Sequence, residues 1–202
     1  MTVSKIARRT LLGVAALFSA APALAAPRKP RVAIETDKGT IIVELEDKKA
    51  PITATNFLYY VDKHRFDGGQ FFRANRAKGA PGAGSIQGQP KPYSRRAPPI
   101  AHESTLKTGL KHTAGAISMG RDAPGSATAD FFLCASAQPY LDAKPGKSDA
   151  AAGYAVFGYV VQGMDVVKKI LAGRTDGVTN VPSMKGQILN PPVKILSMKR
   201  IG

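Results

Sequence analysis

The residues of this chain best able to do chemistry are few, and their spacing excludes several reactions. The three histidines, His64, His102 and His112, form no H-x-x-x-H or H-x-E pattern, so the sequence predicts no metal site. There is no G-x-S-x-G elbow, no P-loop and no G-x-G-x-x-G that follows a strand. The single cysteine, Cys134, follows Phe-Phe-Leu in a strand-like run, and we interpret it as a buried, inert thiol.

The feature that stands out is cationic and aromatic. An arginine closes the apolar stretch "FDGGQFFR", and strand alternation predicts that Phe71 and Arg73 share one face. Taken alone, such an arginine could simply solvate its charge at the rim of a sheet. Other polar and aromatic side chains also lie near turns or strand ends: Gln87, Phe132, Tyr140 and Tyr154.

Residues 118–134, "SMGRDAPGSATADFFLC", place a loop of small residues directly beside an aromatic pair. Gly, Pro, Asp and Ser form turns at the surface, whereas paired phenylalanines belong in a core. The juxtaposition raises the question of what lies against this loop.

Hydrophobic periodicity predicts short strands with two helices. Alternation and a D-x-G turn at 37–39 favour a hairpin over 31–46. Apolar residues at 54, 57, 58 and 61 share one helical face, with Thr53 as the N-cap and Gly68-Gly69 as the stop. Further strands are predicted at 70–75, 85–89, 115–120, 130–136, 154–161 and 193–201, and a second helix at 163–172, while the rest of 77–99 is expected to be irregular. The pattern favours a β-barrel with helical caps.

The N-terminal residues 1–25 are typical of an export signal. They combine basic residues, an apolar segment at 11–18 and an A-x-A site at 23–25. Arg8-Arg9 also resembles a twin-arginine signal, so both export routes stay open. The apolar segment is too short for a membrane anchor. We therefore expect a periplasmic or secreted protein, with a linker at 26–31 and one domain at 32–202.

The chain is strongly basic, with 29 Lys and Arg against 14 Asp and Glu and a net charge of +15. The predicted signal carries three of the basic residues and no acidic one, which leaves +12 after cleavage. Such a charge could attract nucleic acid. However, the basic residues are spread along the chain without the interleaved aromatics of single-strand binders, so we expect a solvated basic surface and no nucleic-acid partner.

The motifs "FDGGQFFRA", "IQG", "HTAGAISMGRDAPGSATADFFLC", "YLD" and "GYAVFGYVVQGMDVV" together resemble the cyclophilins, which are peptidyl-prolyl cis–trans isomerases. The resemblance runs from about residue 32 to 201. It implies an eight-stranded antiparallel barrel capped by two helices, with a substrate groove on its outer face. It also answers the question of the loop: an extended peptide would pass close to its backbone, and Phe132 would form the floor of a proline pocket.

Matched motif by motif, the resemblance assigns roles to particular positions. Arg73 takes the catalytic position, and the other matched residues are substrate-binding: Gln87 as the groove glutamine, Gly120 and Arg121 as the backbone-binding pair, Phe132 and Leu141 in the pocket, Tyr140 where many members carry tryptophan and Tyr154 where many carry histidine.

The chain departs from the family pattern at several positions. About six extra residues lie between Arg73 and Gln87, and Gly84 and Ser85 replace apolar wall residues. Asp130 replaces the family's glutamine. By alternation Asp130 shares a face with Phe132. In the geometry that the resemblance implies, this face borders the groove, so we expect Asp130 to pair with Arg73 and to have a pKa below the usual value of about 3.9. The alternative is that Asp130 only caps the preceding loop and has no link to Arg73.

Prolyl isomerisation makes and breaks no bond, so no nucleophile, metal or cofactor is expected. Two hypotheses compete: a prolyl isomerase that assists the folding of exported proteins, and a peptide-binding or chaperone module of the same fold with weak or no turnover. In both, the partners are proline-containing segments of unfolded or exported polypeptides, with no membrane insertion after cleavage, and the protein is expected to act as a monomer.

Overall fold

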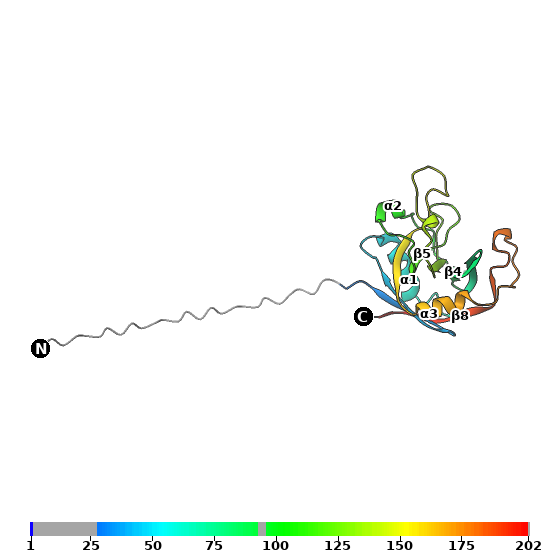
Figure 1. Cartoon of the computed structure of the whole chain (residues 1–202), viewed down its shortest axis with the longest axis horizontal. Helices are drawn as coiled ribbons and strands as arrows, with labels where there is room; N and C mark the ends of the chain where they lie inside the picture. Colours follow the sequence, from blue (N-terminus) through cyan, green and yellow to red (C-terminus); the bar gives the residue numbers. More distant parts are fainter. Residues whose placement is uncertain (2–27, 93–95, 202) are drawn as a thin grey trace.

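The computed structural model describes Met1, residues 28–92 and residues 96–201. The predicted export signal falls almost entirely outside these described residues. Within them, eight strands close into one antiparallel barrel, which confirms the barrel that the resemblance implies (Figure 1). The order of the strands around it is β1-β2-β7-β5-β6-β4-β3-β8. The strands are β1 (Arg31–Thr36), β2 (Gly39–Leu45), β3 (Gln70–Ala77), β4 (Ala80–Gln89), β5 (Ala116–Met119), β6 (Phe131–Cys134), β7 (Val156–Gln162) and β8 (Ile188–Ile201).

Two main helices accompany the barrel. Helix α1 (Pro51–Asp62) packs against β7 and β8, and α3 (Met164–Leu171) packs against β2, β3 and β4. Short helical turns complete the described part: α2 (Thr105–Thr108), η2 (Pro139–Leu141) and η3 (Pro182–Met184). No helix in the described ranges has both the length and the apolar character to cross a membrane.

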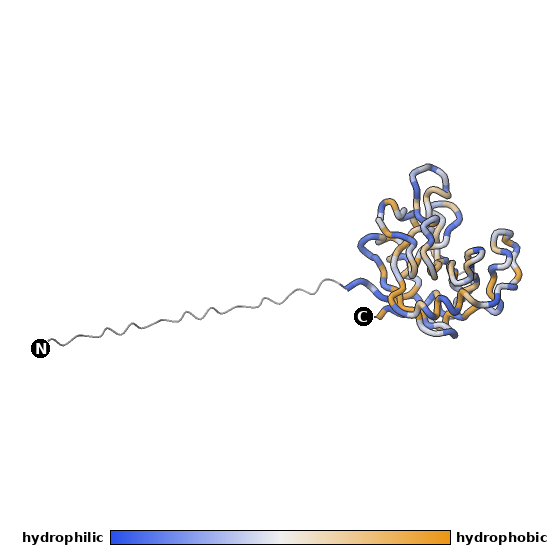
Figure 2. The backbone as a smooth tube through the Cα atoms, viewed as in Figure 1, coloured by the Kyte–Doolittle hydropathy of each residue, from blue (hydrophilic) through white to orange (hydrophobic). Residues whose placement is uncertain are grey.

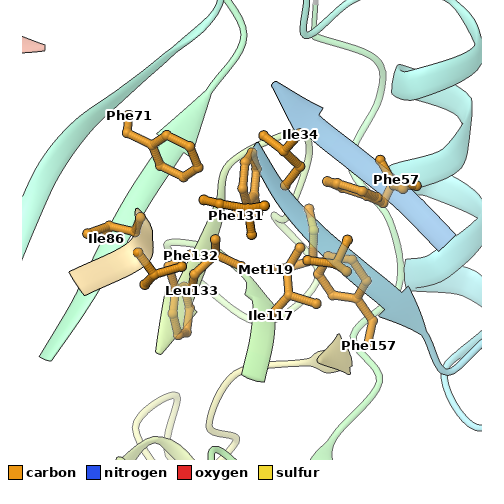
Figure 3. Close-up of a cluster of buried hydrophobic side chains, with 14 of the residues drawn as sticks. Ile34, Phe57, Phe71, Ile86, Ile117, Met119, Phe131, Phe132, Leu133 and Phe157 are labelled. Carbon is orange, nitrogen blue, oxygen red and sulfur yellow. The ribbon is translucent and has the colours of Figure 1, made fainter. Parts of the chain in front are cut away.

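The barrel closes because its strands present alternate side chains to one shared core. In β2, Ile41, Val43 and Leu45 are fully buried while the residues between them are not. The interior is rich in phenylalanine, and the rings of Phe71 and Phe131 lie 5.6 Å apart in edge-to-face contact (Figure 3). Apolar stretches follow the strands and helices, whereas the exposed loops are mostly hydrophilic (Figure 2).

Helix α1 begins earlier than the sequence predicts. Thr53 is not its N-cap: the cap is Ala50, and Pro51 takes the first turn, where its missing N–H is tolerated. The free N–H groups of the first turn bond to a residue far away in the sequence. The Glu103 carboxylate accepts from the N–H groups of Ile52 (3.1 Å) and Thr53 (2.7 Å). The carboxylate also suits the positive end of the helix. The helix ends at Asp62, before the predicted stop at Gly68.

The prediction of an irregular stretch at 77–99 is wrong at its start. Strand β4 begins at Ala80, because the extra residues after β3 lengthen the β3–β4 hairpin, in which Ala77 pairs with Ala80. Strand β8 also begins at Ile188, earlier than the predicted 193. The predicted hairpin at 37–39 is confirmed, with Thr36 paired to Gly39.

Candidate active site

A β-bulge in β3 determines where Arg73 points. Opposite β4, Phe71 pairs with Gly88 and Arg73 with the next residue, Gln87, so Phe72 is an extra residue in β3. The register with β8 also shifts between Phe71 and Arg73. Phe71 is fully buried in the barrel, whereas Phe72 and Arg73 both line an outer groove. The prediction that Phe71 and Arg73 share a face is therefore wrong, because the bulge interrupts the alternation on which it depends.

This groove, about 780 Å³ in volume, collects every site residue that the sequence singles out. They are Arg73, Gln87, Gly120, Arg121, Asp130, Phe132, Tyr140, Leu141 and Tyr154. Further residues line the groove although no pattern in the sequence marked them as site residues: Phe72, Asn75, Arg96, Gln138, Val181, Ser183 and Met184.

Two neutral amide oxygens hold the Arg73 guanidinium. Its Nε donates to Gln187 Oε1 at 2.8 Å and its Nη1 to Gln87 Oε1 at 3.1 Å. Among the described residues it makes no ion pair and no other hydrogen bond, so two of its five N–H groups are used and three stay available. Partial burial lowers the pKa of Arg73 from its ordinary value, yet an arginine stays charged at neutral pH. The site thus offers a positioned, uncompensated cation.

Phe132 forms an apolar surface in the groove. It follows Phe131 in β6, and alternation turns Phe131 into the core while Phe132 faces the groove at 7% exposure. Its ring meets Tyr154 edge-on at 5.5 Å and stacks on His112 at 5.8 Å. A flat ring held on two sides is a rigid surface for a small apolar group.

Beneath Phe132 lies a hydrogen-bonded row of Ser118, His112 and Asp142 that the sequence did not predict. His112 Nδ1 lies 2.7 Å from Asp142 Oδ1, and His112 Nε2 lies 3.0 Å from Ser118 Oγ. The residue types are those of a serine hydrolase. However, Ser118 is fully buried and cannot reach a substrate. We interpret the row as support for the Phe132 ring.

The burial of His112 in this row predicts how the stability of the protein depends on pH. Burial lowers the pKa of His112 from its ordinary value and outweighs the opposing effect of Asp142. The neutral imidazole therefore contributes stability that is present above about pH 6.5 and is lost as the pH falls through the lowered folded-state pKa. Urea unfolding between pH 7.5 and 5 should show wild type losing stability relative to His112→Gln. Equal slopes for the two proteins would contradict the prediction.

Gly120 and Arg121 have internal partners in this structure. The Gly120 N–H donates to the carbonyl oxygen of Asp130 at 2.6 Å, and a Cβ at Gly120 would lie 3.1 Å from the Asp130 Cβ. Glycine therefore keeps the groove open here. Arg121 donates from Nε to the carbonyl oxygen of Gly153 (2.9 Å), and its guanidinium lies 4.9 Å from the centre of the Tyr154 ring. Arg121 thus holds Tyr154 in place beside Phe132.

The expected pair between Asp130 and Arg73 is wrong. Asp130 Oδ1 instead accepts from Arg96 Nη2 at 2.5 Å, and Arg96 also donates to Thr128 Oγ1 at 3.1 Å. Burial raises the pKa of Asp130, with the Arg96 interaction opposing, so the expected lowering is also wrong. The physical reason is that Arg96 enters the groove from a separate segment and takes the carboxylate, which leaves Arg73 to its amide partners.

The backbone explains why the apolar wall is missing at Gly84. Gly84 has φ +142°, and a Cβ there would lie 2.0 Å from the carbonyl oxygen of Asn75, so no larger residue fits. Gln138 Nε2 donates to the Gly84 carbonyl at 2.9 Å, while Gln138 Oε1 accepts from the Tyr140 hydroxyl at 2.7 Å. Apolar side chains at Val181 and Met184 line the groove from another segment.

The described residues offer neither a reactive thiol nor a cluster of metal ligands. Cys134 is buried, as the sequence predicts, and this burial raises the pKa of its thiol to about 12, which disfavours the reactive thiolate. No group of three or more His, Cys, Asp or Glu side chains in the described ranges could hold a metal ion.

The sequence is similar to known peptidyl-prolyl cis-trans isomerases. The family model for cyclophilin-type peptidyl-prolyl cis-trans isomerases matches residues 31–200. Peptidyl-prolyl cis-trans isomerase A of Dickeya dadantii is 35% identical and covers 90% of this chain and 93% of its own length. The peptidyl-prolyl cis-trans isomerase of Acinetobacter baylyi is 35% identical over 95% of both chains. Peptidyl-prolyl cis-trans isomerase B of Escherichia coli is 36% identical over 75% of this chain and 92% of its own.

A solved structure has the same fold. It is a cyclophilin-type isomerase of Cryptosporidium parvum, determined in the presence of the dipeptide Ala-Pro. It superposes with a TM-score of 0.65, covering 85% of this chain and 99% of its own, at 20% sequence identity.

Proposed function

Because the chain belongs to the cyclophilin-type peptidyl-prolyl cis–trans isomerases, we propose that Arg73 and Phe132 carry its isomerase reaction. The observation that supports this most is the state of Arg73. The guanidinium is half-buried, is held by two neutral oxygens, and shares one groove with the Phe132 ring. It can therefore donate to a substrate without first breaking an ion pair.

The reaction needs no covalent chemistry. Rotation about an X–Pro bond crosses a barrier of roughly 18–20 kcal/mol, because amide resonance is lost in the twisted state. In that state the lone pair localises on the prolyl nitrogen and becomes a hydrogen-bond acceptor. Arg73 donates to this nitrogen, and the donation is stronger in the transition state than in the planar ground state. Differential binding of this kind lowers the barrier.

Different residues around the groove contact different parts of the substrate. The proline ring lies on Phe132, bordered by Tyr154 and Leu141. The segment before proline runs extended past Gly120, where the absence of a side chain leaves room. The structure of the neighbour determined in the presence of the dipeptide Ala-Pro supports proline-containing peptides as ligands.

We propose further that the substrates are exported proteins during folding. The A-x-A site at 23–25 and the apolar segment before it support export of this chain. The mature domain would then meet unfolded chains in the periplasm or outside the cell, where slow X–Pro isomerisation limits folding.

Export predicts a defined mature N-terminus. Cleavage after Ala25 should yield a product that begins at Ala26, since small residues at 23 and 25 fit the signal peptidase site. Mass spectrometry of the protein from a periplasmic or secreted fraction measures this. Ala25→Asp, with a charge at the cleavage site, should block processing, whereas Ala26→Ser should not. A full-length product in the cell would overturn the export proposal.

A protease-coupled assay on an Ala-Pro peptide tests the isomerase proposal, with the catalytic variants described in the Discussion. Turnover that depends on both Arg73 and Phe132 supports the assigned roles. A protein that binds the peptide tightly but barely accelerates its isomerisation would favour the peptide-binding alternative.

A further inference from the structure

The segment of residues 174–187, between α3 and β8, borders the groove and is the orange-red loop at the right of Figure 1. It contains the turn η3, and Val181, Ser183 and Met184 line the groove from it. Its last residue, Gln187, bonds directly to Arg73. The segment therefore reaches the groove from a part of the sequence far from β3.

Contacts with β3 hold this segment at both ends. At its start, Arg76 donates to the carbonyl oxygen of Gly173 at 3.0 Å and to Thr175 Oγ1 at 2.6 Å. At its end, the Ala74 N–H donates to the carbonyl oxygen of Gln187 at 2.8 Å. Ala74 directly follows Arg73, so the backbone of Gln187 is fixed beside the arginine that it contacts.

The side chain of Gln187 is oriented as well. Its Nε2 donates to the carbonyl oxygen of Ser183 at 3.1 Å, and its backbone N–H donates to the carbonyl oxygen of Met184 at 3.0 Å. Because the amide nitrogen is used on the η3 side, the amide oxygen faces Arg73 Nε at 2.8 Å. Both ends of the amide thus have partners, which leaves it one favourable orientation.

We propose that Gln187 is a positioning residue for Arg73, an inference that rests on the proposed catalytic role of Arg73. The bond to Nε fixes the plane of the guanidinium, and Gln87 fixes its rotation from the other side. A neutral acceptor suits this task because a carboxylate in its place would partly neutralise the cation. Gln187 touches no reacting atom and acts only through Arg73.

Gln187→Met tests the proposal, since methionine has similar length and its thioether sulfur is only a weak acceptor for Nε. We expect kcat/KM on an Ala-Pro peptide to fall about 10- to 100-fold, mainly through kcat, since small misplacements of a catalytic group cost up to about 10²-fold. In an Arg73→Ala background the same substitution should have no further effect. Lys185→Met, an exposed change in the same segment, is the matched control and should keep wild-type kinetics.

A spectroscopic measurement separates positioning from a structural role. In the wild type, the Arg73 Nε–H resonance should exchange slowly with water, and in Gln187→Met it should exchange like that of a free arginine. Rapid exchange in the wild type would overturn the proposal even if the variant failed to fold. An additive loss in the Arg73→Ala background would do so too. Normal turnover in Gln187→Met, with Arg73→Ala impaired, would refute only this inference, whereas normal turnover in Arg73→Ala would refute the catalytic role itself.

Discussion

Replacing Arg73 with alanine is expected to lower kcat/KM on an Ala-Pro peptide by about 10²–10³-fold, with little change in stability. The loss follows from the geometry, because Arg73 is the half-buried cation that Gln87 and Gln187 hold in the groove without neutralising it. One charge-assisted hydrogen bond is worth about 1.5–3 kcal/mol, or roughly 10- to 150-fold. The upper part of the expected range therefore depends on preorganisation of the guanidinium.

Arg73→Lys should recover only part of the activity. An ammonium carries the charge but lacks the planar fork that binds two amide oxygens and leaves further donors for the substrate. Arg200→Ala is the control, because Arg200 forms an exposed ion pair with Asp62 on another part of the surface, and such pairs contribute little. Stopped-flow or protease-coupled kinetics with urea unfolding of each variant measures both properties. Wild-type turnover in Arg73→Ala would show that another group stabilises the twisted state.

The second large effect is expected at Phe132. Burial of an apolar group the size of a proline ring is worth about 1.5–3 kcal/mol, so loss of the surface beneath it should lower kcat/KM by about 10- to 150-fold, mainly through KM. Phe132→Ala also leaves a cavity, and such changes destabilise by about 3–5 kcal/mol. Phe132→Leu is therefore the more informative variant, with a smaller loss in both properties.

The adjacent phenylalanine provides a matched control for Phe132. Phe131 is fully buried inside the barrel and packs on Phe71 and Phe57, whereas Phe132 faces the groove. Phe131→Leu should reduce stability and leave KM close to wild type. If Phe131→Leu raised KM as much as Phe132→Leu, the effect would come from loosening of β6, and the assignment of Phe132 as the pocket floor would be wrong.

Local sequence patterns determined most of the barrel. The alternation in β2 and the D-x-G turn before it predicted the first hairpin, and the periodicity of residues 54–61 predicted the buried face of α1. These predictions were confirmed because the two-residue repeat of strands and the 3.6-residue repeat of helices depend on residues close together in the sequence. The resemblance of whole motifs went further, since it identified eight residues that the structure brings to one groove, and alternation added Asp130 as a ninth.

Contacts between segments far apart in the sequence decided which side chains form hydrogen bonds and ion pairs in the groove. Arg96 meets Asp130 across 34 positions, and Gln187 meets Arg73 across 114, and no pattern in the sequence links either pair. The sequence instead suggested an Asp130–Arg73 pair, from alternation, charge and the geometry that the resemblance implied.

The sequence by itself determined which residues are apolar, which can carry charge and roughly where the strands and helices lie along the chain. Only the tertiary structure decided the direction of Arg73, because the bulge at Phe72 is defined by the pairing of β3 with β4, and the register with β8 shifts at the same place. It also decided that Gly84 can bear no side chain, since the Asn75 carbonyl that occupies the space comes from the neighbouring strand. Strand register and close approach depend on both partners at once, and a pattern read along one segment contains only half of that information.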